Sequence, residues 1–206
     1  MDETVLRRLA EHTGVEADPI YIAHGKDRLR DSVPGYNNAA RFSPWLIIVD
    51  LDHDADCAPP FVSAWLPQPS PHMCFRVAVR AIEAWLMADR DRLASFLHVS
   101  PHNVPGDPET LPDPKRAIVD LARQSRRPVI QAEMVPRPRS GRAIGPAYTS
   151  RMIEFATDRR RGWRPTVAAR SADSLARCLQ ALRVLVRSET SSSSPGRTAS
   201  PPRSSA

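Results

Sequence analysis

The sequence has few residues of several kinds, and each shortage excludes a class of protein. Its three cysteines, Cys57, Cys74 and Cys178, form an odd and scattered set, which argues against a disulfide framework and for a reducing compartment. No apolar run approaches the length of a membrane span, and residues 1–14 lack a secretory signal pattern. The sequence therefore predicts a cytoplasmic protein that has no contact with a membrane.

Lysine is almost missing, since Lys26 and Lys115 are the two lysines and every other basic residue is arginine. The net charge of +6 is divided unevenly along the chain. Residues 1–122 contain 12 basic and 18 acidic residues, whereas residues 123–206 contain 17 basic and 5 acidic residues. An acidic half followed by a basic half is typical of a protein that combines a metal site with a polyanion-binding surface. A solvated basic surface is the alternative interpretation.

Hydrophobic periodicity predicts an α/β protein. Residues 44–50 include an unbroken apolar run that ends at Asp50, which is typical of a strand covered on both faces in a parallel sheet, and residues 73–79 are expected to form the next strand. Residues 18–25 are expected to form another short strand, followed by a polar connection at residues 26–43 with a short helix near residues 38–42. The predicted helices are residues 3–14, residues 81–97 with a break and an N-cap at Asp89, short helices after Ser100 and Asp113, residues 150–156 and residues 171–186.

Three regions follow from these elements and from the charge distribution. Residues 1–125 are expected to form the α/β core, and residues 126–187 a basic helical region packed on it. Residues 188–206 have no apolar pattern and are rich in serine and proline, so a disordered tail is expected there.

The strand at residues 44–50 leads directly into a series of acids at alternate positions, Asp50, Asp52, Asp54 and Asp56. Carboxylates about 6 Å apart repel each other by roughly 3 kcal/mol at an effective dielectric constant near 20. In α/β sheets, ligands bind outside the carboxyl ends of the strands, which is where these acids lie. A bound divalent cation, Mg²⁺ or Mn²⁺, would remove the repulsion, and a solvated turn is the alternative.

Other interpretations of the acidic segment fit less well. A calcium loop requires a glycine and a closing glutamate at the positions of Ala55 and Phe61. Zinc ligation by cysteine and histidine matches no strong spacing, and the prolines between residues 59 and 71 indicate a stiff loop. A haloacid-dehalogenase-like phosphotransferase would use Asp50 as nucleophile and Asp52 as general acid, but it favours Thr or Val where this chain has Asp54.

Several segments in this order resemble an uncharacterised bacterial family of TOPRIM-like proteins, related to the topoisomerase-primase fold. They are "DETVLRRLAE", "PWLIIVDLDHDADC", "FRVAVRAIEAWLMADRDRLASFL", "LPDPKRAIVDLAR" and "GPAYTSRMIEFA", and the run from Glu83 to Asp89 is the most specific. The resemblance extends to about Arg187. It implies a mostly parallel sheet flanked by helices, followed by a basic helical C-terminal region.

The resemblance also implies a function and a site. TOPRIM acids hold magnesium for breaking or making phosphodiester bonds, and the D-x-D motif of that fold corresponds to Asp50 and Asp52. We therefore expect Asp50 and Asp52 to be catalytic and, together with Asp54, to bind Mg²⁺ or Mn²⁺. Glu83 lies four residues past the strand at residues 73–79 and can reach the same sheet edge as Asp50, so we expect it to be catalytic too; an acid at a helix start that interacts with the helix dipole is the alternative. Kinship with the nucleases of phage-defence systems implies an ATPase partner. A non-catalytic module that binds nucleic acid or a partner protein is the alternative.

Two arginine-rich segments are candidates for nucleic-acid binding. The glycine-containing loop before residue 148 offers arginines and backbone N–H groups to phosphate, and the segment at residues 158–165 adds a ring, Trp163, that is expected either to stack on a base or to pack in the core. The arginines expected to contact nucleic acid are Arg137, Arg139, Arg142, Arg159, Arg160 and Arg161.

One part of the TOPRIM pattern would precede Met1. That pattern begins with a strand that ends in a Glu-Gly turn, and no such strand lies ahead of Asp2. We expect an upstream in-frame extension that encodes it. Without that strand, the apolar face of the helix at residues 3–14 is expected to be uncovered.

Overall fold

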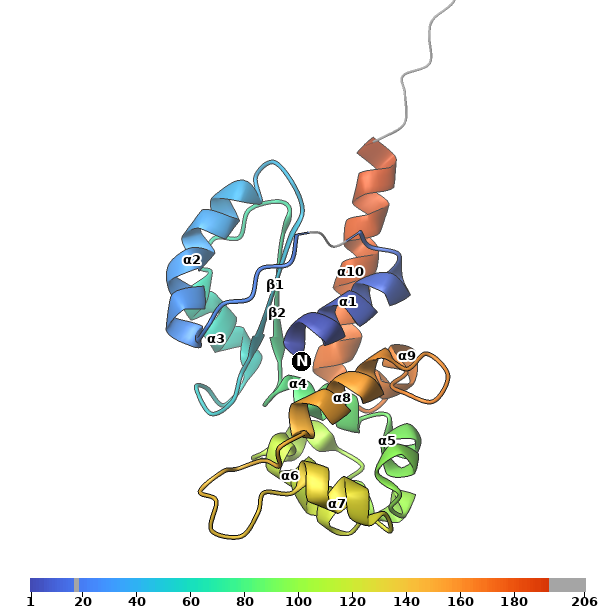
Figure 1. Ribbon diagram of the computed structural model, residues 1–206. Coiled ribbons are helices and arrows are strands. Elements are labelled where there is room, and N and C mark those ends of the chain that lie inside the picture. The colour runs from blue at the N-terminus through green and yellow to red at the C-terminus, as the bar shows by residue number, and fades with distance from the viewer. Residues whose placement is uncertain (17–18, 193–206) are drawn as a thin grey trace, which may run out of the picture.

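A parallel pair of strands lies at the centre of one half of the molecule (Figure 1). The computed structural model describes residues 1–16 and 19–192. Strand β1 (Trp45–Asp50) pairs with β2 (Met73–Ala78) in the register Trp45↔Met73 to Asp50↔Ala78. Two of the three predicted strands are therefore confirmed, and the protein has a mixed α/β fold with a small parallel sheet flanked by helices.

Helices make up most of the rest of the described chain, and Figure 1 labels them in order along the sequence. The α-helices are α1 (Asp2–Thr13), α2 (Lys26–Ala39), α3 (Ala58–Trp65), α4 (Ile82–Met87), α5 (Arg90–Leu97), α6 (Pro114–Arg123), α7 (Pro128–Met134), α8 (Tyr148–Thr157), α9 (Pro165–Ala168) and α10 (Asp173–Ser192), with short 3₁₀ helices at Pro101–Asn103 and Pro108–Thr110. In the described part of the chain, no helix is long and apolar enough to cross a membrane.

One face of the sheet packs against α2 and α3 and forms a small core (Figure 1). The small core consists of Val33, Ile47, Val49, Leu51, Phe61, Leu66, Phe75 and Val77. Alternate side chains of β1 point to the other face, where Leu46 and Ile48 pack against a second, larger core. The expectation that this strand is covered on both faces is confirmed.

The larger core is built mainly from helices on the other side of the sheet and below it (Figure 1). Its largest fully buried side chains are Trp85, Trp163, Tyr148 and Phe155. This core draws residues from both sides of position 125, where the sequence placed a regional boundary. The basic helical region is thus continuous in packing with the residues that precede it.

The apolar face of α1 is covered, contrary to expectation. Val5, Leu9 and Ala10 are buried, because α1 packs against α8 and α10. Gly14 ends the helix with φ 75°, a left-handed conformation that glycine adopts without strain.

Two predictions for the segment between α1 and β1 are wrong. Residues 19–25 contain no strand, and the expected polar connection is helix α2 for most of its length. Leu29, Val33 and Tyr36 recur at helical spacing and contact the small core, so the helix has a narrow apolar face among many charged residues. Pro34 lies inside this helix.

Two further predictions concern loops. The proline-rich loop expected after residue 58 contains α3, because the prolines occupy its first turn, where a missing N–H costs no hydrogen bond. The disordered tail was expected from Ser188, but α10 continues to Ser192; residues 193–206 lie outside the described residues.

Asp89 occupies the predicted N-cap position of α5, but its side chain has another role. It precedes α5, but its side chain makes no capping hydrogen bond. Instead the buried carboxylate accepts hydrogen bonds from Arg164, at 2.9 Å from Nε, 2.7 Å from Nη2 and 2.8 Å from the backbone nitrogen. The adjacent Trp163 donates its indole N–H to the carbonyl oxygen of Trp85 at 2.9 Å. This pair of contacts joins the start of α9 to α4 and α5.

Candidate functional site

Asp50 and Glu83 are positioned by neighbouring elements at the carboxyl end of the sheet. Asp50 is the last residue of β1, and its Oδ1 accepts a hydrogen bond from the backbone N–H of Ile82 at 3.0 Å. Ile82 begins α4, so Glu83 lies in the first turn of that helix, with 1% of its surface exposed. Both acids were predicted from the sequence as site residues, and the fold brings them close enough for the charge of Glu83 to raise the pKa of Asp50.

Burial and like charge oppose the ionisation of both carboxyl groups. Burial raises the pKa of Asp50 to about 7, assisted by the nearby charges of Glu83, Asp2 and Asp52 and opposed by the hydrogen bond from Ile82. Burial also raises the pKa of Glu83, although its interactions with a lysine oppose that shift. At neutral pH, Asp50 is therefore able to gain or lose a proton.

Lys115 and Tyr148 complete this group, which we call the carboxylate cluster (Asp50, Glu83, Lys115 and Tyr148). The Nζ atom of Lys115 lies 3.4 Å from Glu83 Oε1, an ion-pair distance without hydrogen-bond geometry, so Oε1 is a buried atom with no hydrogen-bond partner. The buried hydroxyl of Tyr148 has no partner either. Burial raises its pKa, as do the charges of Glu83 and Asp113.

Three residues of this region were not predicted from the sequence: Lys115, Tyr148 and Asp2. Lys115 lies in the first turn of α6, which Asp113 caps by accepting a hydrogen bond from the backbone N–H of Arg116 at 2.8 Å. The predicted helix start after Asp113, together with the scarcity of lysine, was a signal that could have drawn attention to Lys115. No local pattern distinguishes Tyr148 or Asp2.

The acidic turn, defined here as Asp52, Asp54 and Asp56, is separate from the carboxylate cluster. Lys26 Nζ lies 2.7 Å from Asp52 Oδ2 and 2.6 Å from Asp54 Oδ2, and it donates a hydrogen bond to the Leu51 carbonyl oxygen at 3.3 Å. Burial lowers the pKa of Lys26, but hydrogen bonds to the two aspartates outweigh burial and raise it. Asp52 and Asp54 were expected to need a divalent cation to offset their mutual repulsion. The ammonium group of Lys26 offsets it instead.

No group of three or more His, Cys, Asp and Glu side chains suited to a metal occurs in residues 1–16 and 19–192. This finding argues against a zinc site with four ligands. It also indicates that Asp50, Asp52 and Asp54 do not together form a three-ligand metal site. Two carboxylates are sufficient for Mg²⁺, which retains several waters and takes further ligands from substrate phosphates. The unpartnered Oε1 of Glu83 and the mutual repulsion of Glu83 and Asp50 fit a cation at that position.

The arginines at residues 159–161 are partly engaged within the protein. Arg159 forms an ion pair with Glu11, and Asp158 Oδ1 accepts hydrogen bonds from the backbone N–H groups of Arg160 and Arg161 at 2.8 and 2.9 Å. Both of these side chains are exposed. Trp163 is fully buried, so stacking on a base is excluded and packing in the core is confirmed.

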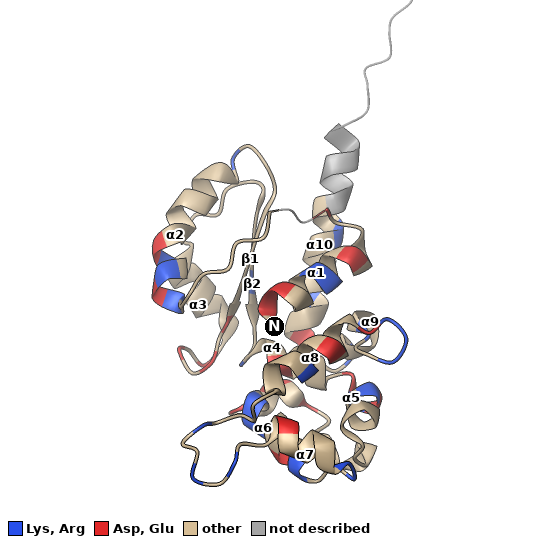
Figure 2. Cartoon of the chain, in the orientation of Figure 1, with Lys and Arg blue, Asp and Glu red and all other residues tan. Residues whose placement is uncertain are grey.

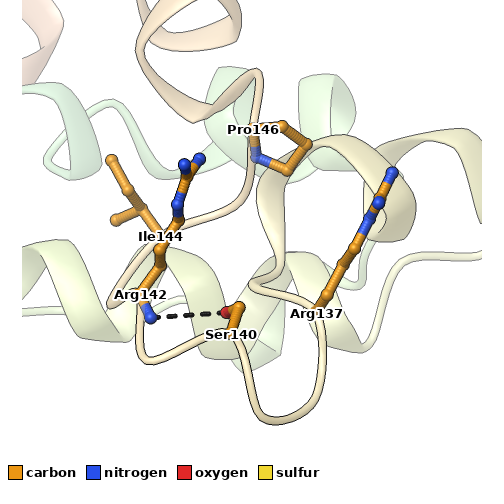
Figure 3. Close-up of a pocket in the computed structure, with 5 residues that line it drawn as sticks. All are labelled: Arg137, Ser140, Arg142, Ile144 and Pro146. Atoms are coloured by element: carbon orange, nitrogen blue, oxygen red, sulfur yellow. Dashed lines mark hydrogen bonds between the residues drawn. The ribbon is translucent and has the colours of Figure 1, made fainter.

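The loop between α7 and α8 holds the other predicted arginines (Figure 2). Figure 3 shows a pocket of about 440 Å³ in this loop, where Arg137 and Arg142 stand on opposite sides of Pro146. Ser140 Oγ accepts a hydrogen bond from the Arg142 backbone N–H at 3.3 Å, and Arg139 has a positive φ of 61°. Two arginines therefore line this pocket, and guanidinium groups favour anions such as phosphate. Its loop leads into α8 at Tyr148, a member of the carboxylate cluster.

Comparisons of the chain with protein-family models, curated proteins and solved structures find no match. The class that the structure defines is a helix-rich α/β protein with a two-stranded parallel sheet, and with the half-buried Asp50 and the buried Glu83 at the carboxyl end of that sheet.

Proposed function

We propose that the protein carries out divalent-metal-dependent phosphodiester chemistry on nucleic acid, as a TOPRIM-like nuclease. The observation that carries the proposal is the pair formed by the half-buried Asp50 and the fully buried Glu83, which repel each other at the carboxyl end of β1. Within the described residues, Glu83 Oε1 also lacks a hydrogen-bond partner. Perturbed carboxyl groups of this kind concentrate at functional sites.

Asp50 and Glu83 would hold Mg²⁺ or Mn²⁺. Such an ion, when bound, polarises a phosphoryl oxygen and lowers the pKa of a coordinated water. The ammonium group of Lys115 is available to a phosphate oxygen because half of that side chain is exposed, and the Tyr148 hydroxyl is a free donor beside Glu83. Asp52 and Asp54 hold Lys26 instead, and they shape the turn that follows β1.

The basic half of the chain would bind the nucleic-acid backbone. Arg137 and Arg142 flank one pocket, and the side chains of Arg160 and Arg161 are exposed on a second segment. These residues would supply a salt-dependent, sequence-independent contact. Kinship with phage-defence nucleases and the use of an ATPase partner belong to the same proposal.

A non-catalytic nucleic-acid-binding module is the second candidate. It is favoured by the ion pairs of Lys26 with Asp52 and Asp54, because they occupy two of the acids expected to bind metal. In that case the arginines bind nucleic acid and the carboxylate cluster takes up no metal.

Metal binding and cleavage distinguish the two candidates. Calorimetric titration with Mn²⁺ is expected to give one binding event in the wild type that is lost in the Asp50→Asn/Glu83→Gln double variant and kept in Asp54→Asn. Labelled single- and double-stranded DNA and RNA are then incubated with Mg²⁺ or Mn²⁺, and the double variant is expected to abolish cleavage. Equal heats in all three proteins would exclude the metal site. Salt-dependent binding without cleavage by the wild type would establish the module.

A further inference from the structure

Within residues 1–16 and 19–192, no strand lies beside one edge of β1. In a parallel pair, alternate residues of a strand direct their N–H and C=O groups to the same neighbour. The Trp45 N–H donates to the His72 carbonyl oxygen, and the Leu51 N–H to that of Ala78, both at 2.9 Å, so the odd-numbered residues of β1 face β2. The backbone groups of Leu46 and Ile48 therefore face away from β2, and no backbone partner for them occurs among the described residues.

A groove of about 430 Å³ runs along this edge. One wall comes from α1 and α10, through Leu6, Ala10 and Leu182; the other comes from α2 and the segment before it. The wall on the α2 side is formed by Tyr21, Leu29 and Tyr36. Figure 1 shows α1 and α10 on one side of the strands and α2 on the other. The groove thus continues the sheet beyond β1, with helices covering both of its faces.

The lining of the groove defines what can occupy it. Among the described residues that line it, Glu16 is the one charged residue, and the others are almost all apolar. A strand laid beside β1 would place alternate side chains against the two walls, so both of its faces must be apolar. Such a strand would also satisfy the free backbone groups of Leu46 and Ile48, which a globular apolar surface could not do.

A second copy of this chain is poorly suited to the groove. The free edge of β1 lies between helices, so the same recessed edge of another copy cannot reach it. The other strand of the sheet, β2, is paired with β1 and packs against α3 and α10. The described part of the chain therefore offers no exposed strand that could be donated to a second copy.

We propose that the free edge of β1 binds an extended, uncharged and apolar segment of a partner polypeptide by strand addition. The backbone of Leu46 and Ile48 would supply the hydrogen bonds, and the two walls of the groove would select apolar side chains. This inference is independent of the proposed phosphodiester chemistry, because it uses none of the residues of the carboxylate cluster in the groove.

Amide hydrogen exchange on the full ¹⁵N-labelled protein tests the proposal. The probe is the peptide acetyl-KVIVLVK-amide, in which the terminal lysines provide solubility. The control peptide has the same sequence, but the backbone nitrogens of alternate residues carry N-methyl groups. These residues then have no N–H group to donate to a neighbouring strand. The first peptide is expected to slow exchange of the Leu46 and Ile48 amides by about tenfold or more, and the methylated peptide to leave it unchanged.

A variant of the groove wall provides the second measurement. Leu6→Arg places a charge in the groove and is expected to weaken peptide binding at least tenfold. Val184→Arg, on an exposed position of α10, is the matched control and is expected to bind like the wild type. The proposal is overturned if the unmethylated peptide leaves exchange at Leu46 and Ile48 unchanged, or if both peptides bind equally. Slower exchange at higher protein concentration without peptide would identify a second copy as the occupant and would also overturn it.

Discussion

The acidic turn and the carboxylate cluster follow each other in the sequence, yet their charges are balanced in different ways. Asp52 and Asp54 are about half exposed and share one close cation, Lys26. Glu83 is fully buried and Asp50 half-buried, and Lys115 lies near Glu83 without forming a hydrogen bond of good geometry. The exposed acids are thus neutralised within the fold, while the buried acids keep an unfavourable interaction.

This difference separates a structural arrangement from a candidate functional one. Exposed carboxylates beside a lysine are compensated by that lysine and by solvent, so the fold needs no bound ligand to tolerate them. Buried carboxyl groups that repel each other reduce stability, and such groups concentrate where a ligand or a reaction uses them. Three experiments test how far the two regions differ, in order of decreasing expected effect.

The largest expected effect is the contribution of Asp50 to the pH dependence of the free energy of unfolding. Its pKa rises from 3.8 to about 7 on folding, so the folded state retains a proton that the unfolded state releases. The free energy of unfolding is therefore expected to fall as pH rises from 4 to 7, by about 4 kcal/mol at about 1.4 kcal/mol per pKa unit. Urea unfolding with EDTA across this range measures the slope.

Asp50→Asn is expected to remove this contribution. The variant should equal the wild type near pH 4 and exceed its free energy of unfolding at pH 8, because the amide does not ionise. Asp54→Asn is the matched control and is expected to keep the wild-type slope. Identical slopes for the wild type and Asp50→Asn would show that Asp50 titrates normally.

A smaller loss is expected when the cation of the carboxylate cluster is removed. Lys115→Met leaves the buried carboxylate of Glu83 without its ion-pair partner, so the free energy of unfolding at pH 8 should fall by about 1–3 kcal/mol. The loss should shrink at acidic pH, because the pKa of Glu83 is raised and the group becomes neutral. Arg116→Met, which removes an exposed pair with Asp120, is the control and should cost less than about 1 kcal/mol. Equal losses for the two variants would contradict the importance of burial.

The smallest effect is expected at the acidic turn. Lys26→Met removes the cation from Asp52 and Asp54, but solvent screens those carboxylates, so the loss at pH 8 should be about 1 kcal/mol or less. Denaturant unfolding at low and high salt should show the loss decreasing as salt is added. A loss larger than that of Lys115→Met would reverse the comparison between the two regions.

Local patterns were sufficient to predict the strands and most of the helices. Strand β1 is an apolar run that ends at Asp50, β2 is apolar apart from Arg76, and α1 and α10 have clear apolar faces, so their signals lie within each segment. Helix α2 was missed because its few apolar residues are surrounded by polar ones. The strand expected near Ile20 does not form, and Tyr21 instead stacks against Trp45 and Tyr36, with ring centroids 6.0 and 6.3 Å away.

The candidate site was predictable only in part. Asp50 ends β1, and Glu83 lies shortly after β2 in the first turn of α4. Because the carboxyl ends of parallel strands lie at the same edge of a sheet, both acids could be predicted at this edge. Lys115 and Tyr148 belong to α6 and α8, and their proximity to Glu83 depends on how those helices pack, which no local spacing encodes. The partner of Asp52 and Asp54, Lys26, is likewise distant in sequence and lies in the helix that was not predicted.

The packing of α1 against α8 and α10 also bears on biosynthesis. Glu11 meets Arg159, and His12 meets Thr166, so the first helix is matched with residues that are translated much later. At 5–20 residues per second, Val5 and Leu9 wait roughly ten to thirty seconds before Leu182 leaves the ribosome. We expect the nascent chain to expose this apolar helix for that interval, which makes it a substrate for chaperones until the last part of the large core is synthesised.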